Sequence, residues 1–276
     1  MSDTPPDRPS FEALTLARDA LRDLWDARRF HVILSLIAVL PRAVMDAFGL
    51  LSPYYAGVLA QTLPPGYWQA ALLFLLWAAL WNTPMLVLWF RRFMVGPQDV
   101  LRLGLGQLTQ RSLLFLGYSF LLIVGIGVIV MLSTVVLSGI LSIFASGKSA
   151  AALPFGFLLV LVIGLYFFFG TRFMLTFGAL TVGERLSLRD SWRLTANIAG
   201  PIIGALALCL LGSLMVAQGI YWLVTLAIIG PSGIPAGAPV PAVLHILDLI
   251  LAPLNYAATA LMAAICARVY HALRHP

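Results

Sequence analysis

Charged residues are scarce in this chain. Asp, Glu, Lys and Arg make up only 10% of its 276 residues, whereas hydrophobic residues make up 61%. Soluble domains carry about 25% charged residues, and a soluble fold of this length cannot bury so much apolar surface. The composition therefore excludes a soluble globular domain and predicts an integral membrane protein.

Lysine and cysteine are also rare. Arginine supplies 16 of the 17 basic residues. Because these arginines are spread over short segments between apolar runs, the net charge of +6 does not indicate a nucleic-acid partner. The two cysteines, Cys209 and Cys266, lie in different apolar runs without a spaced partner, so we expect free thiols and no metal site.

Sequence motifs that carry catalysis are missing as well. No nucleophile motif, zinc motif or glycine-rich dinucleotide loop stands in a suitable context. The segment SGKS at 146–149 contains the only lysine, but it lacks the upstream glycine of a phosphate-binding loop. We therefore expect no enzyme activity and no cofactor.

Long apolar runs are what the chain has in abundance. A membrane-spanning helix needs about 20 apolar residues, and these runs lack the alternation over about ten residues that marks membrane barrels. The prediction is an all-α, polytopic transmembrane helix bundle, with a polar, disordered tail at 1–10 and a single membrane domain at 11–276. The six predicted spans are 31–59, 67–90, 113–145, 152–171, 198–229 and 242–267.

The placement of arginine predicts the orientation of the bundle. Four segments hold 15 of the 17 basic residues, and all four fall on one side of a six-span arrangement. Basic loops stay in the cytoplasm, so we expect both termini to be cytoplasmic.

Three amphipathic helices are expected on that side of the membrane. Residues 11–28 place apolar and charged residues on opposite faces, 188–197 repeat the pattern, and 98–111 do so more weakly because they contain two glycines. The segment LRDLW at 21–25 recurs as LRDSW at 188–192, and RFM at 92–94 recurs at 172–174. We interpret this pattern as three repeated units, at about 11–94, 95–174 and 183–272.

Basic and aromatic residues of these helices are the predicted interfacial contacts. Arginine attracts anionic lipid, and tryptophan prefers the headgroup level of a membrane. Alternatively, the Arg and Asp of each LRD segment form solvated pairs, and the tryptophans only anchor the protein. The predicted interfacial residues are Arg22, Trp25, Arg102, Arg189 and Trp192.

The stretch GERLSLRDSWRLTANIAGPI, residues 183–202, follows the basic end of an apolar helix. It resembles the cytoplasmic helix of uncharacterised six-span bacterial membrane proteins that are related to the membrane domain of glycerophosphoryl diester phosphodiesterases. The resemblance covers the whole layout and implies a bacterial inner membrane and a connection with lipid. It implies no phosphodiesterase activity, because the separate soluble domain that carries this activity has no room here.

Charged residues inside the apolar runs form a second candidate site. Arg42 and Asp46 are four residues apart and share a helix face, as His245 and Asp248 do at a spacing of three. Both pairs are expected at similar depth, so a cluster of the four is geometrically allowed. Three interpretations stay open for Arg42 and Asp46: an ion pair that fixes helix packing, a contact with a substrate or ion, or a span that ends early and leaves both near the outer surface.

Polar residues and prolines interrupt two of the predicted spans. Asn82, Thr83 and Pro84 fall in the second span, and Pro253 and Asn255 fall in the sixth. Interrupted helices line binding sites in some transporters, but polar side chains more often join helices and proline is tolerated as a kink. We include Asn82 and Asn255 in the candidate intramembrane site.

These patterns favour a non-enzymatic membrane protein that binds lipid, or a membrane partner protein, through its cytoplasmic amphipathic helices. The alternative is a small transporter with a polar site around Arg42, Asp46 and Asp248. An intramembrane enzyme that modifies lipid is a third hypothesis, which the missing catalytic residues weaken.

Overall fold

A computed structural model describes residues 11–54, 63–144, 152–230 and 242–274 of the chain. The predicted tail at 1–10 lies outside this part. The described residues form helices and no strand. The helices are α1 (Ala13–Asp26), α2 (Arg28–Ala47), α4 (Tyr67–Leu76), the π-helix η1 (Trp77–Asn82), α5 (Thr83–Met94), α6 (Leu105–Phe144), α7 (Ala152–Val182), α8 (Leu188–Thr195), α9 (Ala199–Ile229), α10 (Ala242–Ile250) and α11 (Ala252–Arg274).

Six helical stretches in the described chain are long and apolar enough to cross a membrane. This confirms the predicted all-α bundle with six spans. The second stretch combines α4, η1 and α5, and the sixth combines α10 and α11. The six stretches are Arg28–Ala47, Tyr67–Met94, Leu105–Val136, Val160–Val182, Ala199–Ile228 and Ile246–Arg274.

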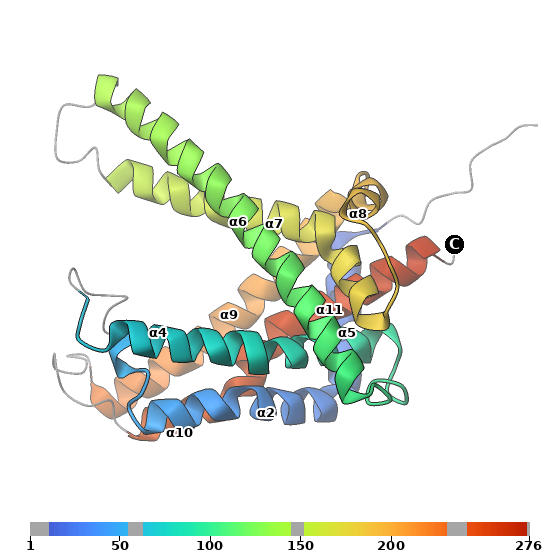
Figure 1. Ribbon diagram of the computed structural model, residues 1–276, viewed down its shortest axis with the longest axis horizontal. Helices are drawn as coiled ribbons and strands as arrows, with labels where there is room; N and C mark the ends of the chain where they lie inside the picture. The colour runs from blue at the N-terminus through green and yellow to red at the C-terminus, as the bar shows by residue number, and fades with distance from the viewer. Residues whose placement is uncertain (1–10, 55–62, 145–151, 231–241, 275–276) are drawn as a thin grey trace, which may run out of the picture.

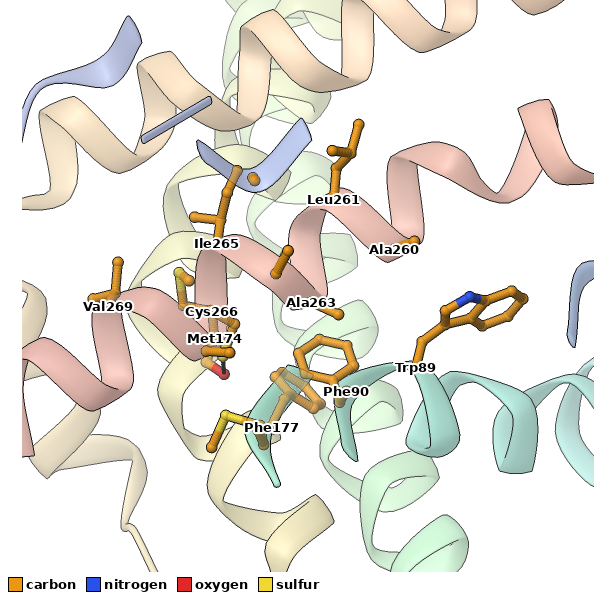
Figure 2. Packing of buried hydrophobic residues seen from close by; sticks show 14 of the residues in the cluster. Trp89, Phe90, Met174, Phe177, Ala260, Leu261, Ala263, Ile265, Cys266 and Val269 are labelled. Carbon is orange, nitrogen blue, oxygen red and sulfur yellow. Dashed lines mark hydrogen bonds between the residues drawn. The ribbon is translucent and has the colours of Figure 1, made fainter. Parts of the chain in front are cut away.

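Helix α11 lies at the centre of the bundle and packs against α1, α2, α5, α7 and α9. Its buried face is rich in alanine, including Ala260, Ala263 and Ala264, which are fully buried. Small side chains let helix backbones approach closely in a membrane, where apolar surface alone gives little driving force. Figure 2 shows this face of α11 against Phe90 of α5 and Phe177 of α7.

The bundle has two ends, which we name from the chain (Figure 1). The terminal end carries α1, α8 and the last turn of α11, and the far end carries the C-terminal end of α2 and the start of α10. Helices α6 and α7 pack on each other and extend together toward the upper left of Figure 1, away from α2 and α4. Much of the apolar surface of α6 is therefore left for lipid.

The first span ends earlier than predicted. Helix α2 stops at Ala47 because Gly49 adopts a φ of 70°, a left-handed conformation that glycine adopts without strain. The amide of Gly49 donates to the carbonyl of Asp46, and the amide of Leu50 donates to that of Met45, each at 2.9 Å. These two bonds form a complete Schellman cap. The predicted helix over 31–59 is wrong in this respect, and Asp46 lies in the last turn of α2.

Prolines inside the spans are accommodated by neighbouring groups. Pro41 has no amide hydrogen to donate to Ile37, and the indole of Trp81 donates to that carbonyl instead at 2.9 Å. In the second span Pro84 likewise has no amide hydrogen for the carbonyl of Leu80, and the helix widens into η1 instead of breaking. The predicted interruption of the second span is therefore a π-bulge, whereas the sixth span does break, at Leu251 between α10 and α11.

Two of the three predicted amphipathic helices form as separate helices. Helices α1 and α8 lie within 11–28 and 188–197, as expected. The prediction for 98–111 is wrong, because residues up to 101 form turns and α6 begins at Leu105 and runs on into the third span. The buried guanidinium of Arg91 accounts for the turn, since it donates to the carbonyls of Asp99 at 2.8 Å and Val100 at 3.3 Å.

Candidate functional sites

Arg42 joins three helical segments at the far end of the bundle. Its Nε lies 3.8 Å from Oδ2 of Asp46 in the same helix, and its Nη2 donates to Oδ2 of Asp248 in α10. Its guanidinium carbon also lies 5.7 Å from the ring centroid of Trp77 in η1. Arg42 therefore forms an ion pair with Asp46, which was one of the three interpretations, and Asp248 is a second partner.

Other predicted members of this site lie close by. The side-chain amide of Asn255 donates to the free oxygen of Asp248 at 3.5 Å, a long contact. Asn82 accepts a hydrogen bond from the hydroxyl of Tyr256 at 3.1 Å. His245 belongs to α10, but its side chain lies outside the described part of the chain. The cluster thus combines one arginine with two aspartates and lies near the C-terminal ends of α2 and α10.

A second polar chain runs from Tyr256 toward the terminal end. The Tyr256 ring stacks on Trp89 at 5.0 Å, and the indole N–H of Trp89 donates to Nδ1 of His31 at 3.1 Å. Because Nδ1 accepts, Nε2 carries the proton of the neutral ring and donates to the Pro253 carbonyl at 2.7 Å. Sequence reasoning missed His31, which stands at the edge of an apolar run with nothing nearby that marks it.

The acidic residues of α1 are held against the bundle by one arginine. Arg268 of α11 donates from Nε and Nη2 to both carboxylate oxygens of Asp23, at 2.6 and 2.7 Å. Its Nη1 reaches Asp19 at 3.2 Å. A two-point guanidinium–carboxylate contact is among the strongest hydrogen-bonded pairs. These aspartates also line a cavity of about 570 Å³ between α1, α5 and α11, so the acidic stripe of α1 faces the protein.

The outward face of α1 has a different composition. At about 100° per residue, Leu14, Arg18, Leu21 and Trp25 fall within an arc of about 60°, and Arg22 borders it. Leu14, Leu21 and Trp25 are 73%, 53% and 68% exposed. The side chain of Arg18 is 77% exposed. We call these five residues the outer face of α1. The predicted apolar face is therefore divided, because Ala17 packs inward, where it is buried.

Helix α8 differs from α1 although the two share the LRDxW motif. Ser187 caps α8 by accepting a hydrogen bond from the Asp190 amide at 3.1 Å. Trp192 is not an outward anchor, since its ring packs against Phe168 and Phe173 of α7, at 5.5 and 5.8 Å between centroids. Arg189 is exposed.

The remaining predicted interfacial residue, Arg102, stands in a turn and not on a helix. Its guanidinium pairs with Asp99 at 2.8 Å, and both side chains are largely exposed. The arginines that matter for packing here were not singled out from the sequence. Arg91, which is buried, and Arg111 both donate to the carbonyl of Thr181 near the C-terminal end of α7. Cationic side chains at helix C-termini satisfy such carbonyls.

The described residues contain no group of three or more His, Cys, Asp or Glu that could hold a metal ion. Cys209 and Cys266 are free and buried, in line with the expectation for their thiols. Comparisons with protein-family models, with curated proteins and with solved structures find no match for this chain. The resemblance of residues 183–202 to a bacterial family, and the three-unit repeat, therefore stay predictions.

Proposed function

We propose that this chain is a non-enzymatic protein of the bacterial inner membrane that binds anionic phospholipid through the outer face of α1. In this proposal the terminal end is cytoplasmic, as the arginine distribution predicts. Leu14, Leu21 and Trp25 enter the headgroup region, and Arg18 and Arg22 bind lipid phosphates. Amphipathic helices with this composition lie in the plane of the interface.

One observation carries the proposal: α1 separates its charges by sign. Asp23 turns inward, where Arg268 binds both of its oxygens. Asp19 gives one oxygen to Arg268 at 3.2 Å, and its other oxygen lies 3.8 Å from Nε of Arg18. Among the described residues, no carboxylate lies within 4.0 Å of the Arg22 guanidinium. The solvated Arg–Asp pairs that were the alternative for LRDLW do not describe Asp23, whose carboxylate is taken by Arg268. The outer face combines exposed apolar residues with two arginines, of which Arg18 shares Asp19 with Arg268 and Arg22 has no such pair among the described residues. This combination matches an anionic membrane surface in both polarity and charge.

The test compares two pairs of arginines with equal charge change. One variant carries Arg18→Gln and Arg22→Gln, and the control carries Arg102→Gln and Arg274→Gln. One basic side chain near the surface contributes about 1 kcal/mol of attraction to anionic lipid, so the first variant should bind phosphatidylglycerol roughly 30-fold more weakly. Native mass spectrometry of the purified protein, titrated with phosphatidylglycerol or phosphatidylcholine, measures the difference.

The control and the neutral lipid decide the outcome. We expect the control to keep most of its phosphatidylglycerol affinity, and phosphatidylcholine binding to change little in either variant. An equal loss of phosphatidylglycerol affinity in both variants would show that the affinity depends only on net charge, and it would contradict a role for α1. If the folded variant with Arg18→Gln and Arg22→Gln bound phosphatidylglycerol as tightly as the wild type, α1 would be only a structural anchor.

A small permease is the second candidate, and the Arg42 cluster favours it. Arg42, Asp46 and Asp248 bring charge together from two spans, and charged groups within spans often mark ion or substrate paths. The test is proton uptake by proteoliposomes under an imposed membrane potential, followed with an internal pH-sensitive dye. A permease of this type requires protein-dependent uptake that Asp46→Asn abolishes, and uptake equal to empty liposomes would exclude proton transport.

A further inference from the structure

An apolar groove of about 230 Å³ lies between α6 and α7, and one residue of α8 also lines it. Such a volume is smaller than the 300–1,000 Å³ typical of small-molecule sites, and it suits a segment of one flexible chain. Aromatic rings line its α7 side. The lining residues are Tyr118, Leu121, Leu122, Gly125, Ile126 and Ile129 of α6, Phe169, Phe173 and Phe177 of α7, and Leu188 of α8.

The groove exists because α6 has a glycine where a larger side chain would fill the space. A Cβ added to Gly125 would meet no atom within 4 Å. The groove residues of α6 recur at spacings of three and four, so they share the helix face that packs on α7. A larger residue at position 125 would therefore project into the groove.

An arginine without an acidic partner stands beside the groove. Among the described residues, no carboxylate lies within 4.0 Å of the Arg172 guanidinium, and its buried Nε and Nη1 have no hydrogen-bond partner. Its guanidinium carbon lies 5.0 Å from the ring centroid of Trp192 and 5.3 Å from that of Phe168. The rings fix the position of the charge without neutralising it. Nη2 is not among these shielded nitrogens.

Trp192 connects this arginine to the groove. Its ring lies 6.2 Å from Phe169 and 5.8 Å from Phe173, both of which line the groove, and Arg172 stacks on the same ring. Leu188, which also lines the groove, is one turn before Trp192 on α8. The charge and the apolar groove therefore share one wall.

The register of α6 and α7 places Arg172 nearer the terminal end than Gly125. Phe115 of α6 packs on Phe177 of α7 at 4.9 Å, and the helices run antiparallel. Gly125, ten residues along α6, is then level with about residue 167 of α7, roughly 7 Å beyond Arg172 along the helix axis at 1.5 Å per residue. From Arg172 the groove leads past Gly125, away from the terminal end and into the span.

We propose that this groove binds one acyl chain of an anionic phospholipid whose phosphate is held by Arg172. The chain enters beside Phe173 and passes Gly125 toward the membrane interior. The phosphate oxygens accept from Nη2 of Arg172 and supply the negative charge that the described residues around it lack. This site is separate from the outer face of α1 and does not depend on lipid binding there.

The experiment pairs two glycines of α6 that differ only in direction. Gly125→Leu fills the groove, whereas Gly127→Leu, two residues on, projects from an exposed position where an added Cβ also meets nothing within 4 Å. Both changes replace a helical glycine with leucine, so their effects on helix propensity match. Native mass spectrometry after partial delipidation, with added phosphatidylglycerol or phosphatidylcholine, counts the retained lipids.

We expect Gly125→Leu to retain one lipid fewer than Gly127→Leu. Arg172→Gln should lower phosphatidylglycerol affinity about fivefold, from the roughly 1 kcal/mol that one basic side chain contributes, while phosphatidylcholine binding changes little. Arg172→Lys should restore most of the preference, which separates the role of charge from a packing role on Trp192.

Two results would overturn the proposal. Equal lipid counts in Gly125→Leu and Gly127→Leu would exclude the groove, and if Gly125→Leu also shifted the oligomeric mass, the occupant would be a helix of a second copy. An unchanged ratio of phosphatidylglycerol to phosphatidylcholine affinity in folded Arg172→Gln would exclude phosphate binding at Arg172. If Arg18→Gln with Arg22→Gln lowers lipid binding while Gly125→Leu does not, only the groove proposal fails.

Discussion

Arg42→Leu should destabilise the bundle more than the removal of the whole ion cluster. The substitution leaves two carboxylates without their cation, and the Asp46 side chain is only 10% exposed. Breaking a buried pair by removing one partner costs about 3–5 kcal/mol. Because Asp248 is 26% exposed, we expect about 3 kcal/mol, the lower end of that range. Circular dichroism during SDS titration in mixed micelles measures the free energy of unfolding.

The triple variant Arg42→Leu, Asp46→Asn, Asp248→Asn removes every charge and strands none. It should therefore lie closer to the wild type than Arg42→Leu does, by about 2 kcal/mol. Arg102→Leu is the control, since the exposed pair with Asp99 contributes less than about 1 kcal/mol. If the destabilisation of the three single variants adds up to that of the triple variant, the three residues do not act as a unit.

Two further predictions concern the orientation of the chain in the membrane and the attachment of α1 to the bundle. In a cysteine-free background, single cysteines at Ser149 and Arg193 should react with an impermeant maleimide from opposite sides of the membrane; reaction of both from the outside would refute the six-span orientation. Arg268→Gln should release α1 and speed amide hydrogen exchange in Ala13–Asp26 about tenfold, since a hydrogen bond to a charged group contributes about 1.5 kcal/mol. Arg274→Gln is its control, and equal exchange in the two would show that Arg268 does not hold α1.

Apolar runs predicted the number of spans but not where each helix ends. The first run stays apolar through Leu50 and Leu51, so hydropathy alone extends the helix to residue 59. The helix ends earlier because Gly49 adopts a left-handed backbone conformation. The sequence did contain this stop signal, since glycine is the residue that commonly ends a helix in this way. The prediction of an amphipathic helix over 98–111 was wrong for a different reason. The buried Arg91 takes the carbonyls of Asp99 and Val100, and this tertiary contact leaves no mark in the local pattern.

The candidate sites show the same division between local and distant information. Helical spacing predicted the contact between Arg42 and Asp46, because both lie on one helix. Helical period also predicted α1, but it could not show which stripe faces the bundle. That choice depends on Arg268, which lies 245 residues from Asp23 in the chain. The Arg172 site likewise combines α6, α7 and α8, so no single segment of the sequence marks it.

The position of the outer face of α1 in the membrane is the most direct test of the proposed function. Nitroxide labels at Leu21, on the outer face, and at Asp26, on the acidic side, report their surroundings in liposomes that contain phosphatidylglycerol. Power-saturation electron paramagnetic resonance with oxygen and with a water-soluble nickel chelate distinguishes lipid from water. We predict that the Leu21 label is exposed mainly to oxygen at headgroup depth and the Asp26 label mainly to the nickel chelate. Equal exposure of both labels to the chelate would place α1 in water and contradict lipid binding by its outer face.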